Sequence, residues 1–532
     1  MKILGIQCYQ DYNVCYYDTE TKELRYIEMD KLLKKKHFSF HSQEKIDYAN
    51  YVDSIYKDCM HKNIYKAQKM IKDLFNVDRF DVVVWCYTQF EDGYLKQESF
   101  EFVKMLENCE MKKMHHQENH VLPTAIINKL DNALCVSIDG KGDGNHAVFL
   151  YKDSKLKKMF QEQRFSYGMF YEILSSNFLE TKYYDGMEGK FMAYAGISSN
   201  FIEIRDIRDF MKKIKSINWN NWDEKENIEK YINNYIDQLK LKHNKYDLAY
   251  TFQKIWIDDV LNNVFDKYKE YSDTLVFSGG CALNCMLNYY LAKSMWFKKI
   301  YWNPIASDTG QSVGAVFNYL LNNNPEEVDN LDVKNFYCTS EIYDKNYFDK
   351  YIKNNLIDIN NDKLIEVLEH DGIIGVCRGN IEMGPRALGH RSILASPLNK
   401  EMHDKLNAIK NREWYRPYGI LIPREYMNQY FDIDIDAPYM NVLGYCKKEG
   451  IINGAMHLDG TVRIQTVSEK DDKWLHDLLI AYGKKTGTPI LINTSFNVGG
   501  KPISNYAEDM YKIFEDDLDG IVFEEKMRLK DK

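Results

Sequence analysis

Short apolar segments of strand length recur along the chain, and most are followed by a glycine or acidic turn and then by a stretch of helical character. This order indicates strands and helices alternating around a sheet. The sequence therefore predicts an α/β fold. The segments are ILGIQCY (3–9), RFDVVVWCY (79–87), ALCVSIDG (133–140), HAVFLYKD (146–153), TLVFSGGCALN (274–284) and IYWNPIASDTG (300–310).

A polar segment, LNNNPEEVDNLDV (321–333), interrupts this pattern and has the composition of a linker. Beyond it, IIGVC (373–377) and ILINTSFN (490–497) are strands of a second α/β unit. At roughly 150 residues per domain, the 532 residues allow about two to four domains. We expect one domain over residues 1–335 and a second over 345–532.

The charge balance excludes some partners. Seventy Lys and Arg residues stand against 79 Asp and Glu residues, a formal net charge of −9, so no global basic field attracts nucleic acid or an anionic membrane. No apolar run reaches the ~18 residues of a membrane span, and the first strand is too short for a signal peptide. The 11 cysteines form no CxxC pair. We expect a cytoplasmic protein with free thiols and no membrane contact.

Residues 205–271 are highly charged and carry Ile228, Ile232 and Ile236 at helical spacing. This pattern predicts amphipathic surface helices, which are candidates for a homodimer contact. Trp219 and Trp222 flank the start of the segment, where either core packing or an interaction surface would suit them.

A histidine cluster, MHHQENH (114–120), is the first candidate for chemistry. In a helix, His116 and His120 lie on one face and His115 turns aside. Asp139 and Asp308 each follow a strand, where α/β folds expose functional loops. Together these mixed ligands would suit Fe(II), Zn(II) or Mn(II) better than calcium. The alternative is two surface histidines and two solvated turn aspartates.

Three glycine turns follow strands, at 139–144, 278–280 and 309–310. Backbone amides in such turns, ahead of a helix N-terminus, bind phosphate without a cationic side chain. The GxxxxGK[ST] P-loop is missing, and separated turns are more typical of the two-lobed nucleotide cleft of actin-like ATPases. We therefore expect ATP as a ligand, although glycine turns after strands are common.

The second unit concentrates cationic side chains between glycines and prolines. Arginine presents a planar, permanently charged fork that matches phosphate oxygens, which favours a phosphate site over a solvated face. Structural ion pairs are the alternative for some of these residues. The set comprises Arg386, Arg391, Lys410, Arg412, Arg416 and Arg463, accompanied by Ser495 and Asn497.

Longer sequence blocks connect these residues. In the second unit they are GNIEMGPRALGHRSILASP (379–397), NAIKNREWYRPYGILIP (407–423), HLDGTVRIQTV (457–467) and TGTPILINTSFNVGGKPI (486–503). In the first unit they are, in order, ILGI, HxxxH, SIDGKGDG, MEGKFMAYAG (187–196), FSGGCALN and ASDTGQSVGA. These blocks, in this order, resemble the signature stretches of the O-carbamoyltransferases of nodulation-factor, cephamycin and aminoglycoside biosynthesis.

The resemblance implies two fused domains. The first has the actin-like (ASKHA-type) two-lobed fold and resembles the threonylcarbamoyl-transferring subunit of tRNA modification. The second is YrdC-like and resembles the carbamoyl-adenylate-forming subunit. In the C-terminal domain, carbamoyl phosphate and ATP would yield carbamoyladenylate and pyrophosphate. In the N-terminal domain, the carbamoyl group would pass to a hydroxyl acceptor with release of AMP.

The resemblance also assigns residues. Lys410 and Arg412 match the KxR of the adenylating site, and Arg416 completes the implied catalytic cations. His116, His120 and Asp308 match the metal ligands, for iron(II) as the expected ion, with Asp139 a fourth or outer-sphere candidate. The implied cofactor-binding residues are Gly140, Gly142, Lys190, Gly279, Gly280, Asn284 and Gly310 in the first domain, and Arg386, Arg391, Arg463 and the SxN pair Ser495 and Asn497 in the second.

One departure concerns the acceptor. Family members carry a His-Asp pair shortly after the first strand, whereas this chain reads Tyr9-Gln10-Asp11. Gln10 cannot act as a base. Either Asp11 serves as the catalytic base, another histidine substitutes, the acceptor differs from the family's sugars, or this loop only shapes the pocket and Asp11 caps a turn.

Three functions remain open at this point. The first is an O-carbamoyltransferase for a small molecule or a hydroxymethylated nucleotide or DNA base. The second is a self-contained threonylcarbamoyl transferase for tRNA, which the net charge of −9 disfavours. The third is a nucleotide-binding regulator without turnover, suggested by the missing His-Asp pair.

Overall fold

The computed structural model describes residues 1–7, 11–34, 71–72, 75–86, 109–140, 142–181, 187–219, 222–333, 335–337 and 347–530. The polar segment 321–333, expected as a linker, instead contains the end of helix α12 (Gln311–Asn323) and helix α13 (Pro325–Asp329), and Val328 and Leu331 are buried, so that expectation is wrong. Gln10, Lys141 and residues 338–346 lie outside the described residues, as does the side chain of Trp222. The predicted domain boundary, between residues 335 and 345, therefore stays a prediction. No helix in the described ranges has both the length and the apolar character that crossing a membrane requires.

The first sheet has the strand order β3-β2-β1-β4-β5. The first three strands form an antiparallel meander, and β1, β4 and β5 run parallel. Strand β1 is buried along nearly its whole length, as its apolar run predicts. The strands are β1 (Lys2–Gln7), β2 (Asn13–Asp18), β3 (Leu24–Glu28), β4 (Val82–Cys86) and β5 (Glu110–Met114).

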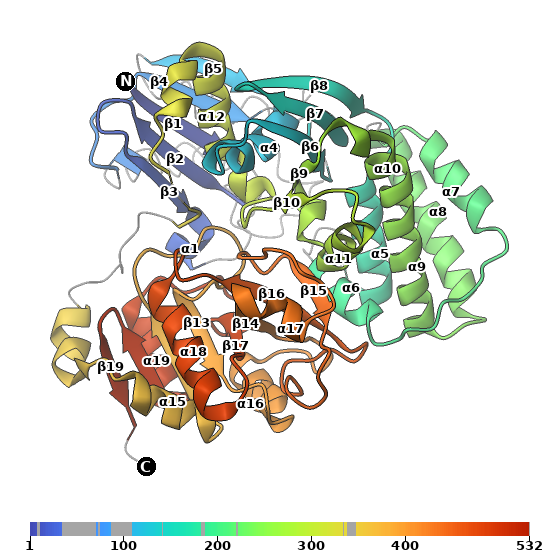
Figure 1. The fold of residues 1–532 in the computed structure, drawn as a ribbon. Coiled ribbons are helices and arrows are strands. Elements are labelled where there is room, and N and C mark those ends of the chain that lie inside the picture. Colours follow the sequence, from blue (N-terminus) through green and yellow to red (C-terminus); the bar gives the residue numbers. More distant parts are fainter. Residues whose placement is uncertain are drawn as a thin grey trace, which may run out of the picture.

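The second sheet repeats this topology. Its order is β10-β9-β6-β7-β8, again with an antiparallel meander of three strands followed by two parallel ones. Two sheets of one topology, side by side in Figure 1, make the duplicated, two-lobed plan of an actin-like domain. The strands are β6 (Asn132–Ile138), β7 (His146–Lys152), β8 (Lys155–Glu162), β9 (Thr274–Ser278) and β10 (Lys299–Tyr301).

Two helices join the lobes at the centre of the unit. Helix α4 (His116–Ile127) and helix α12 (Gln311–Asn323) pack directly on each other, and α12 also covers β1, β2 and β4. A Cβ on Gly314 would lie 2.0 Å from the backbone oxygen of Asn119, so only glycine permits this crossing. On the other side of α12, a Cβ on Gly5 would lie 2.1 Å from the oxygen of Ser312.

Helices also pack at the far side of the second lobe (Figure 1). The expected amphipathic face is confirmed, because Ile228, Ile232 and Ile236 are all buried. Trp219 belongs to the core, where its indole nitrogen donates to the oxygen of Ile214 at 2.8 Å. The helices are α5 (Tyr167–Leu179), α6 (Glu188–Ala195), α7 (Ile207–Ser216), α8 (Trp222–Lys240), α9 (Lys245–Val260), α10 (Asp266–Tyr268) and α11 (Cys285–Ser294).

The C-terminal unit is built on one mixed sheet, β11-β19-β18-β12-β13-β17-β14-β16-β15. Together with the two N-terminal sheets, it confirms the predicted mixed α/β class. The strands are β11 (Ile357–Asp358), β12 (Ile373–Cys377), β13 (Arg391–Ala395), β14 (Gly419–Pro423), β15 (Val442–Tyr445), β16 (Thr461–Val467), β17 (Leu491–Ser495), β18 (Gly520–Phe523) and β19 (Lys526–Leu529). The helices of this unit include α15 (Asn361–Glu369), α16 (Glu401–Lys410), α17 (Met427–Tyr430), α18 (Lys473–Thr486) and α19 (Ala507–Asp517).

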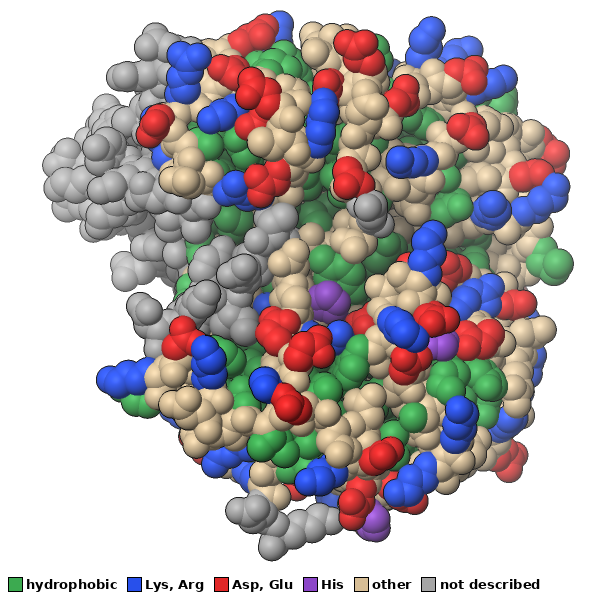
Figure 2. Space-filling model, turned by 60° about the vertical axis from the view of Figure 1, so that its left-hand side comes forward, with side chains coloured by type: hydrophobic (Ala, Val, Ile, Leu, Met, Phe, Trp, Pro, Cys, Tyr) green, Lys and Arg blue, Asp and Glu red, His purple; other side chains and the backbone are tan. Residues whose placement is uncertain are grey.

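The two units are in close contact. Lys31, in α1 (Met29–Leu33), donates to the backbone oxygens of Glu382 at 2.6 Å and Gly384 at 2.8 Å. In the other lobe, the amide of Asn288 donates to the oxygen of Asn441 at 2.7 Å. Figure 2 shows acidic and basic side chains interspersed over the visible face of both units, without a continuous basic surface for nucleic acid.

Candidate active site

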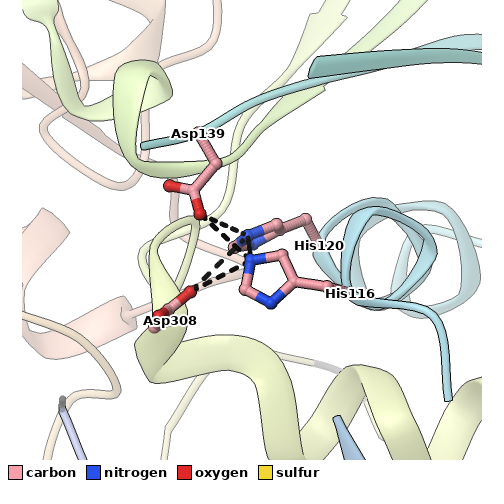
Figure 3. A group of neighbouring side chains, drawn as sticks. All are labelled: His116, His120, Asp139 and Asp308. Atoms are coloured by element: carbon pink, nitrogen blue, oxygen red, sulfur yellow. Dashed lines mark hydrogen bonds and ion pairs between the residues drawn. The ribbon is translucent and has the colours of Figure 1, made fainter. Parts of the chain in front are cut away.

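Four side chains from three chain segments meet between the two lobes (Figure 3). His116 and His120 lie one turn apart on α4, as the i, i+4 spacing predicts. His115 precedes the helix and turns aside, where it pairs with Asp143 at 2.8 Å. Asp139 follows β6, and Asp308 begins the turn before α12.

The ligand atoms of this group all lie within 4.8 Å of one another. Nε2 of His116 is 3.0 Å from Asp139 Oδ2, 3.3 Å from Asp308 Oδ1 and 2.9 Å from Nε2 of His120. A single ring proton cannot serve three such neighbours, and two imidazole lone pairs at that distance repel each other. A divalent cation among the four atoms would satisfy all of them, so this donor set fits a metal ion.

Neighbouring polar groups hold the carboxylates in place. Oδ1 of Asp139 accepts from the backbone N–H of Gly280 at 3.0 Å, which leaves Oδ2 for the histidines. The amide of Asn13 donates to the backbone oxygen of Asp308 at 2.9 Å, and Gln7 Nε2 reaches Asp308 Oδ2 at 3.4 Å. The end of β1 and the start of β2 thus position one ligand, through Gln7 and Asn13 respectively.

The two carboxylates titrate differently. Burial opposes the ionisation of Asp139, but hydrogen bonds from His116 and His120 outweigh it and lower its pKa. Burial raises the pKa of Asp308 to about 8; the charge of His116 opposes this rise and that of Asp139 adds to it. Without a cation, Asp308 therefore tends to keep its proton, and a bound cation would favour the ionised form of both carboxylates.

The predicted glycine turns surround this group. Gly279 has φ +85°, and a Cβ there would lie 2.2 Å from the oxygen of Ile138, so the turn requires glycine. A Cβ on Gly142 would lie 2.5 Å from the ring of His116, and one on Gly310 2.2 Å from the oxygen of Ile305. A Cβ on Gly140 would meet no atom within 4 Å, which leaves that turn open to a ligand.

The structure also places Asn284 and Asp11, two further predicted site residues of this domain. Asn284 is the N-cap of α11, and its side-chain oxygen accepts from the N–H of Leu287 at 3.0 Å. Asp11 has φ +60°, and its charge contributes to raising the pKa of Asp308, so it lies close to the four-residue group. This placement keeps Asp11 a candidate base.

In the C-terminal unit, Lys410 is buried and meets the predicted SxN pair. Its ammonium group donates to Ser495 Oγ at 3.1 Å and to the backbone oxygen of Asn497 at 2.8 Å, and it also contacts Asn497 Oδ1. Burial, with the nearby charges of Arg412 and Arg416, lowers the pKa of Lys410 well below its usual value. The structure therefore brings together the two motifs that the sequence separates by more than 80 residues.

A cluster of guanidiniums lies beside Lys410. Burial, together with repulsion from neighbouring arginines, lowers the pKa of Arg386 and of Arg412 to about 9 and also lowers that of Arg463. Within the described part of the chain, no carboxylate pairs with these three residues, and the buried Nε atom of each has no hydrogen-bond partner. We call Arg386, Lys410, Arg412, Arg416 and Arg463 the cationic cluster. Such uncompensated charge is suited to a polyanion.

Arg391 differs from the other predicted cations. It is fully buried, and its guanidinium donates to the backbone oxygens of Arg378 at 2.8 Å and Gly379 at 2.9 Å. These contacts favour a structural role in that turn over the predicted ligand role.

Lys190 reaches the second unit. It forms an ion pair of 2.7 Å with Glu413, which pairs with Arg416 at 3.0 Å. Sequence reasoning missed Glu413, although a single acid inside KNREWYR was a visible signal. It also missed Tyr418, whose buried ring lies 4.8 Å from the guanidinium carbon of Arg412 and whose hydroxyl donates to Asn407 at 2.7 Å.

Comparisons with known proteins agree with this two-part arrangement. The family model "Carbamoyltransferase N-terminus" matches residues 78–317, and "Carbamoyltransferase C-terminus" matches residues 365–530. An uncharacterised protein of Methanocaldococcus jannaschii is 26% identical, with 97% of each chain covered.

Two relatives carry functional names. Nodulation protein NolNO of Sinorhizobium fredii is 34% identical over 47% of this chain and 38% of its own length. The 3'-hydroxymethylcephem-O-carbamoyltransferase of Streptomyces clavuligerus is 30% identical over 45% of this chain and 46% of its own length. The chain thus matches half or less of either named relative. A crystal structure of full-length HypF in the phosphate- and nucleotide-bound form aligns with a TM-score of 0.34 and 16% identity, covering 61% of this chain and 56% of that one.

Proposed function

Because the chain belongs to the carbamoyltransferase family, whose N- and C-terminal models it matches in order, we propose that it is an ATP-dependent O-carbamoyltransferase with two active sites. The cationic cluster is the observation that supports this proposal most. Five cations with a single acid among them would be costly to bury without an anionic ligand. Triphosphate and pyrophosphate supply the missing charge.

The balance of atoms requires water as well as the two substrates. Hydrolysis of carbamoyl phosphate gives carbamate and inorganic phosphate. A carbamate oxygen then attacks the α-phosphorus of ATP, and pyrophosphate leaves. In the second reaction the acceptor hydroxyl attacks the carbamoyl carbon of carbamoyladenylate, AMP leaves, and the hydroxyl proton passes to a base. The first reaction therefore releases inorganic phosphate as well as pyrophosphate, a product that the family resemblance alone did not indicate.

Each step has residues suited to it. Arg386, Arg412 and Arg463 would neutralise the charge that develops on the phosphates. Lys410 is held by Ser495 and Asn497, with its ammonium group directed at a fixed place in the cluster. In the N-terminal domain, Asp11 would accept the proton of the acceptor hydroxyl.

His116, His120, Asp139 and Asp308 would hold a divalent metal, for which iron(II) is our proposal. Such an ion acts as a Lewis acid toward a carbonyl or phosphoryl oxygen. The chain's own contribution there is to fix the two imidazoles at the start of α4 and to hold Asp139 against the amide of Gly280. We further propose that the acceptor is a small molecule bearing a hydroxyl group.

Exchange of labelled pyrophosphate into ATP tests the adenylating reaction without any acceptor. The proposal expects exchange that depends on carbamoyl phosphate, and a loss of at least about 1,000-fold in Lys410→Met. Exposed Lys230, which pairs with Glu226 far from the cluster, provides the matched control Lys230→Met with unchanged exchange. Absence of exchange by the wild-type protein under iron, zinc and manganese would contradict the proposal.

Mass spectrometry of hydroxyl acceptors then addresses the second reaction. Aminoglycosides, chito-oligosaccharides, hydroxymethylpyrimidine nucleotides, DNA and tRNA are the panel, and a carbamoyl group in place of a hydroxyl hydrogen adds about 43 Da. An adduct on a small molecule supports the proposal. Modification of tRNA alone would favour the threonylcarbamoyl alternative, and exchange without any adduct would favour a regulator.

A further inference from the structure

Helix α6 of the N-terminal domain contacts the 410–417 loop, which begins at the end of α16 and carries Lys410, Arg412 and Arg416 of the cationic cluster. Lys190 and Tyr194 are four residues apart and share one face of this helix. Lys190 pairs with Glu413 at 2.7 Å, and the ring of Tyr194 meets that of Tyr415 edge-on at 5.8 Å. One face of α6 thus contacts two alternate residues of the 410–417 loop.

The C-terminal end of α6 is fixed to the same unit. A Cβ on Gly196 would lie 2.4 Å from Cε1 of His457 and 2.8 Å from Oδ2 of Asp459. His457 and Asp459 are themselves buried and paired at 3.1 Å. Both ends of α6 are therefore in tight contact with the adenylating domain, so the helix cannot shift without disturbing that loop.

An adjoining face of α6 packs within the transfer domain. Phe191 packs on Tyr171 of α5 at 5.3 Å and on Phe178 at 5.5 Å. The start of α5 in turn touches the metal-binding segment, since Ser166 Oγ donates to the oxygen of Gly140 at 2.6 Å and a Cβ on Gly168 would lie 2.7 Å from the oxygen of Asp139. Packed elements therefore connect the cationic cluster to Asp139.

Glu413 is the acid in this contact. Its carboxylate lies between Lys190 of one domain and Arg416 of the other, with each partner only partly exposed. Burial opposes its ionisation, but hydrogen bonds from Lys190 and Arg416 lower its pKa to about 2, so it stays charged at neutral pH. A phosphate oxygen that binds Arg416 competes with Glu413 for the same guanidinium.

We propose that Glu413 is a positioning residue that couples the two half-reactions. Through its ion pair with Lys190, it holds α6 on the 410–417 loop. When a phosphate binds, Arg416 leaves Glu413 and pairs with the phosphate instead. The held helix keeps the carbamoyladenylate away from water until transfer. This inference rests on the proposed function, because it requires an adenylate that one domain makes and the other uses.

The test compares two rates in one reaction without acceptor, using full-length protein, ATP and carbamoyl phosphate. Pyrophosphate exchange into ATP reports formation of the adenylate, and AMP release reports its loss to water. We expect Glu413→Gln to raise the ratio of AMP release to exchange at least tenfold, with exchange itself within about threefold of wild type. Lys190→Met should raise the ratio as much, and Lys190→Arg should keep it low.

A double variant tests whether Glu413 and Lys190 act through their ion pair with each other. Glu413→Gln combined with Lys190→Met should give the same ratio as either single change, because both remove one link. Glu226→Gln removes an exposed pair of the same length, 2.7 Å, and is the matched control with no effect. An unchanged ratio, or exchange and AMP release falling together, would overturn the inference. Absence of exchange in the wild type would instead refute the proposed function.

Discussion

Replacing Arg386 with methionine should stabilise the ligand-free protein and at the same time remove its response to pyrophosphate. The residue lies in the cationic cluster, and no described carboxylate forms an ion pair with it. In the absence of an anion, its charge is buried next to other positive charges. A neutral side chain of similar length removes this repulsion.

The size of the effect follows from the pKa of the guanidinium. Burial and the charge of Arg463 lower that pKa from 12.5 to about 9. Each pKa unit corresponds to about 1.4 kcal/mol, which sets an upper bound of about 5 kcal/mol for the penalty on the charged form. Relaxation and lost side-chain contacts reduce it, so we expect a gain of about 1–3 kcal/mol in Arg386→Met. The penalty is full below pH 9 and shrinks as the pH rises toward 12.5.

Thermal unfolding with and without pyrophosphate measures both parts. At about 2–4 °C for each kcal/mol in a domain of this size, the ligand-free variant should melt several degrees above the wild type. Pyrophosphate should raise the wild-type melting temperature by mass action and leave that of the variant nearly unchanged.

Arg391→Met is the matched control, because the same substitution should act in the opposite direction. Arg391 is fully buried and donates to the backbone oxygens of Arg378, His390 and Gly379, which would lose this donor. Its melting temperature should therefore fall. If Arg386→Met also lowers the melting temperature without ligand, the charge of Arg386 is compensated in the protein and the argument for a polyanion site fails.

Other outcomes test the remaining features. His120→Ala should lower the metal content of anaerobically purified protein, measured by mass spectrometry of the metal, from about one equivalent to below about 0.1; full retention would contradict the four-ligand site. Burial and neighbouring positive charges lower the pKa of Lys410 well below its usual value, so pyrophosphate affinity measured by calorimetry should weaken as the pH rises toward about 10.4, the usual pKa of lysine; a flat profile over that range would count against the assignment of Lys410 to the phosphate site. Gly314→Ala should lower the free energy of unfolding in urea by about 1–3 kcal/mol or more, since its Cβ would lie 2.0 Å from the oxygen of Asn119. Gly189→Ala is the control: its Cβ would meet no atom within 4 Å, so this change should be neutral or slightly stabilising. Equal urea midpoints for the two variants would refute the tight helix crossing.

Apolar runs, glycine turns and helical spacing predicted those strands and helices that depend mainly on residues close together in the sequence. The segments at 133–140 and 274–284 contain β6 and β9, as predicted, because a short apolar run before a glycine turn is typical of a buried strand. The spacing of His116 and His120 similarly places both on α4. Strands β2, β3, β5 and β8 were not singled out, although the buried run NVCYYD of β2 was available as a signal.

Contacts between distant segments could not be predicted in the same way. The pairing of Lys190 with Glu413 joins residues more than 200 positions apart across two domains. The structural contacts of Arg391 were equally hidden, because its place in GPRALGHRS gives no sign of which arginines face a ligand. The sequence predicted which residue types would gather in each unit, whereas their partners depend on how the two units pack.

The route of the chain through the two lobes also has a consequence for biosynthesis. The second lobe takes all its strands, β6 to β10, from one continuous stretch of chain. The first lobe begins at Lys2, yet α12, which packs on β1, β2 and β4, follows only at residues 311–323. On a ribosome the second lobe is therefore complete before the first can close. The N-terminal strands have to wait, partly assembled, for a helix made some 300 residues later, which makes them the segment most in need of protection by a chaperone.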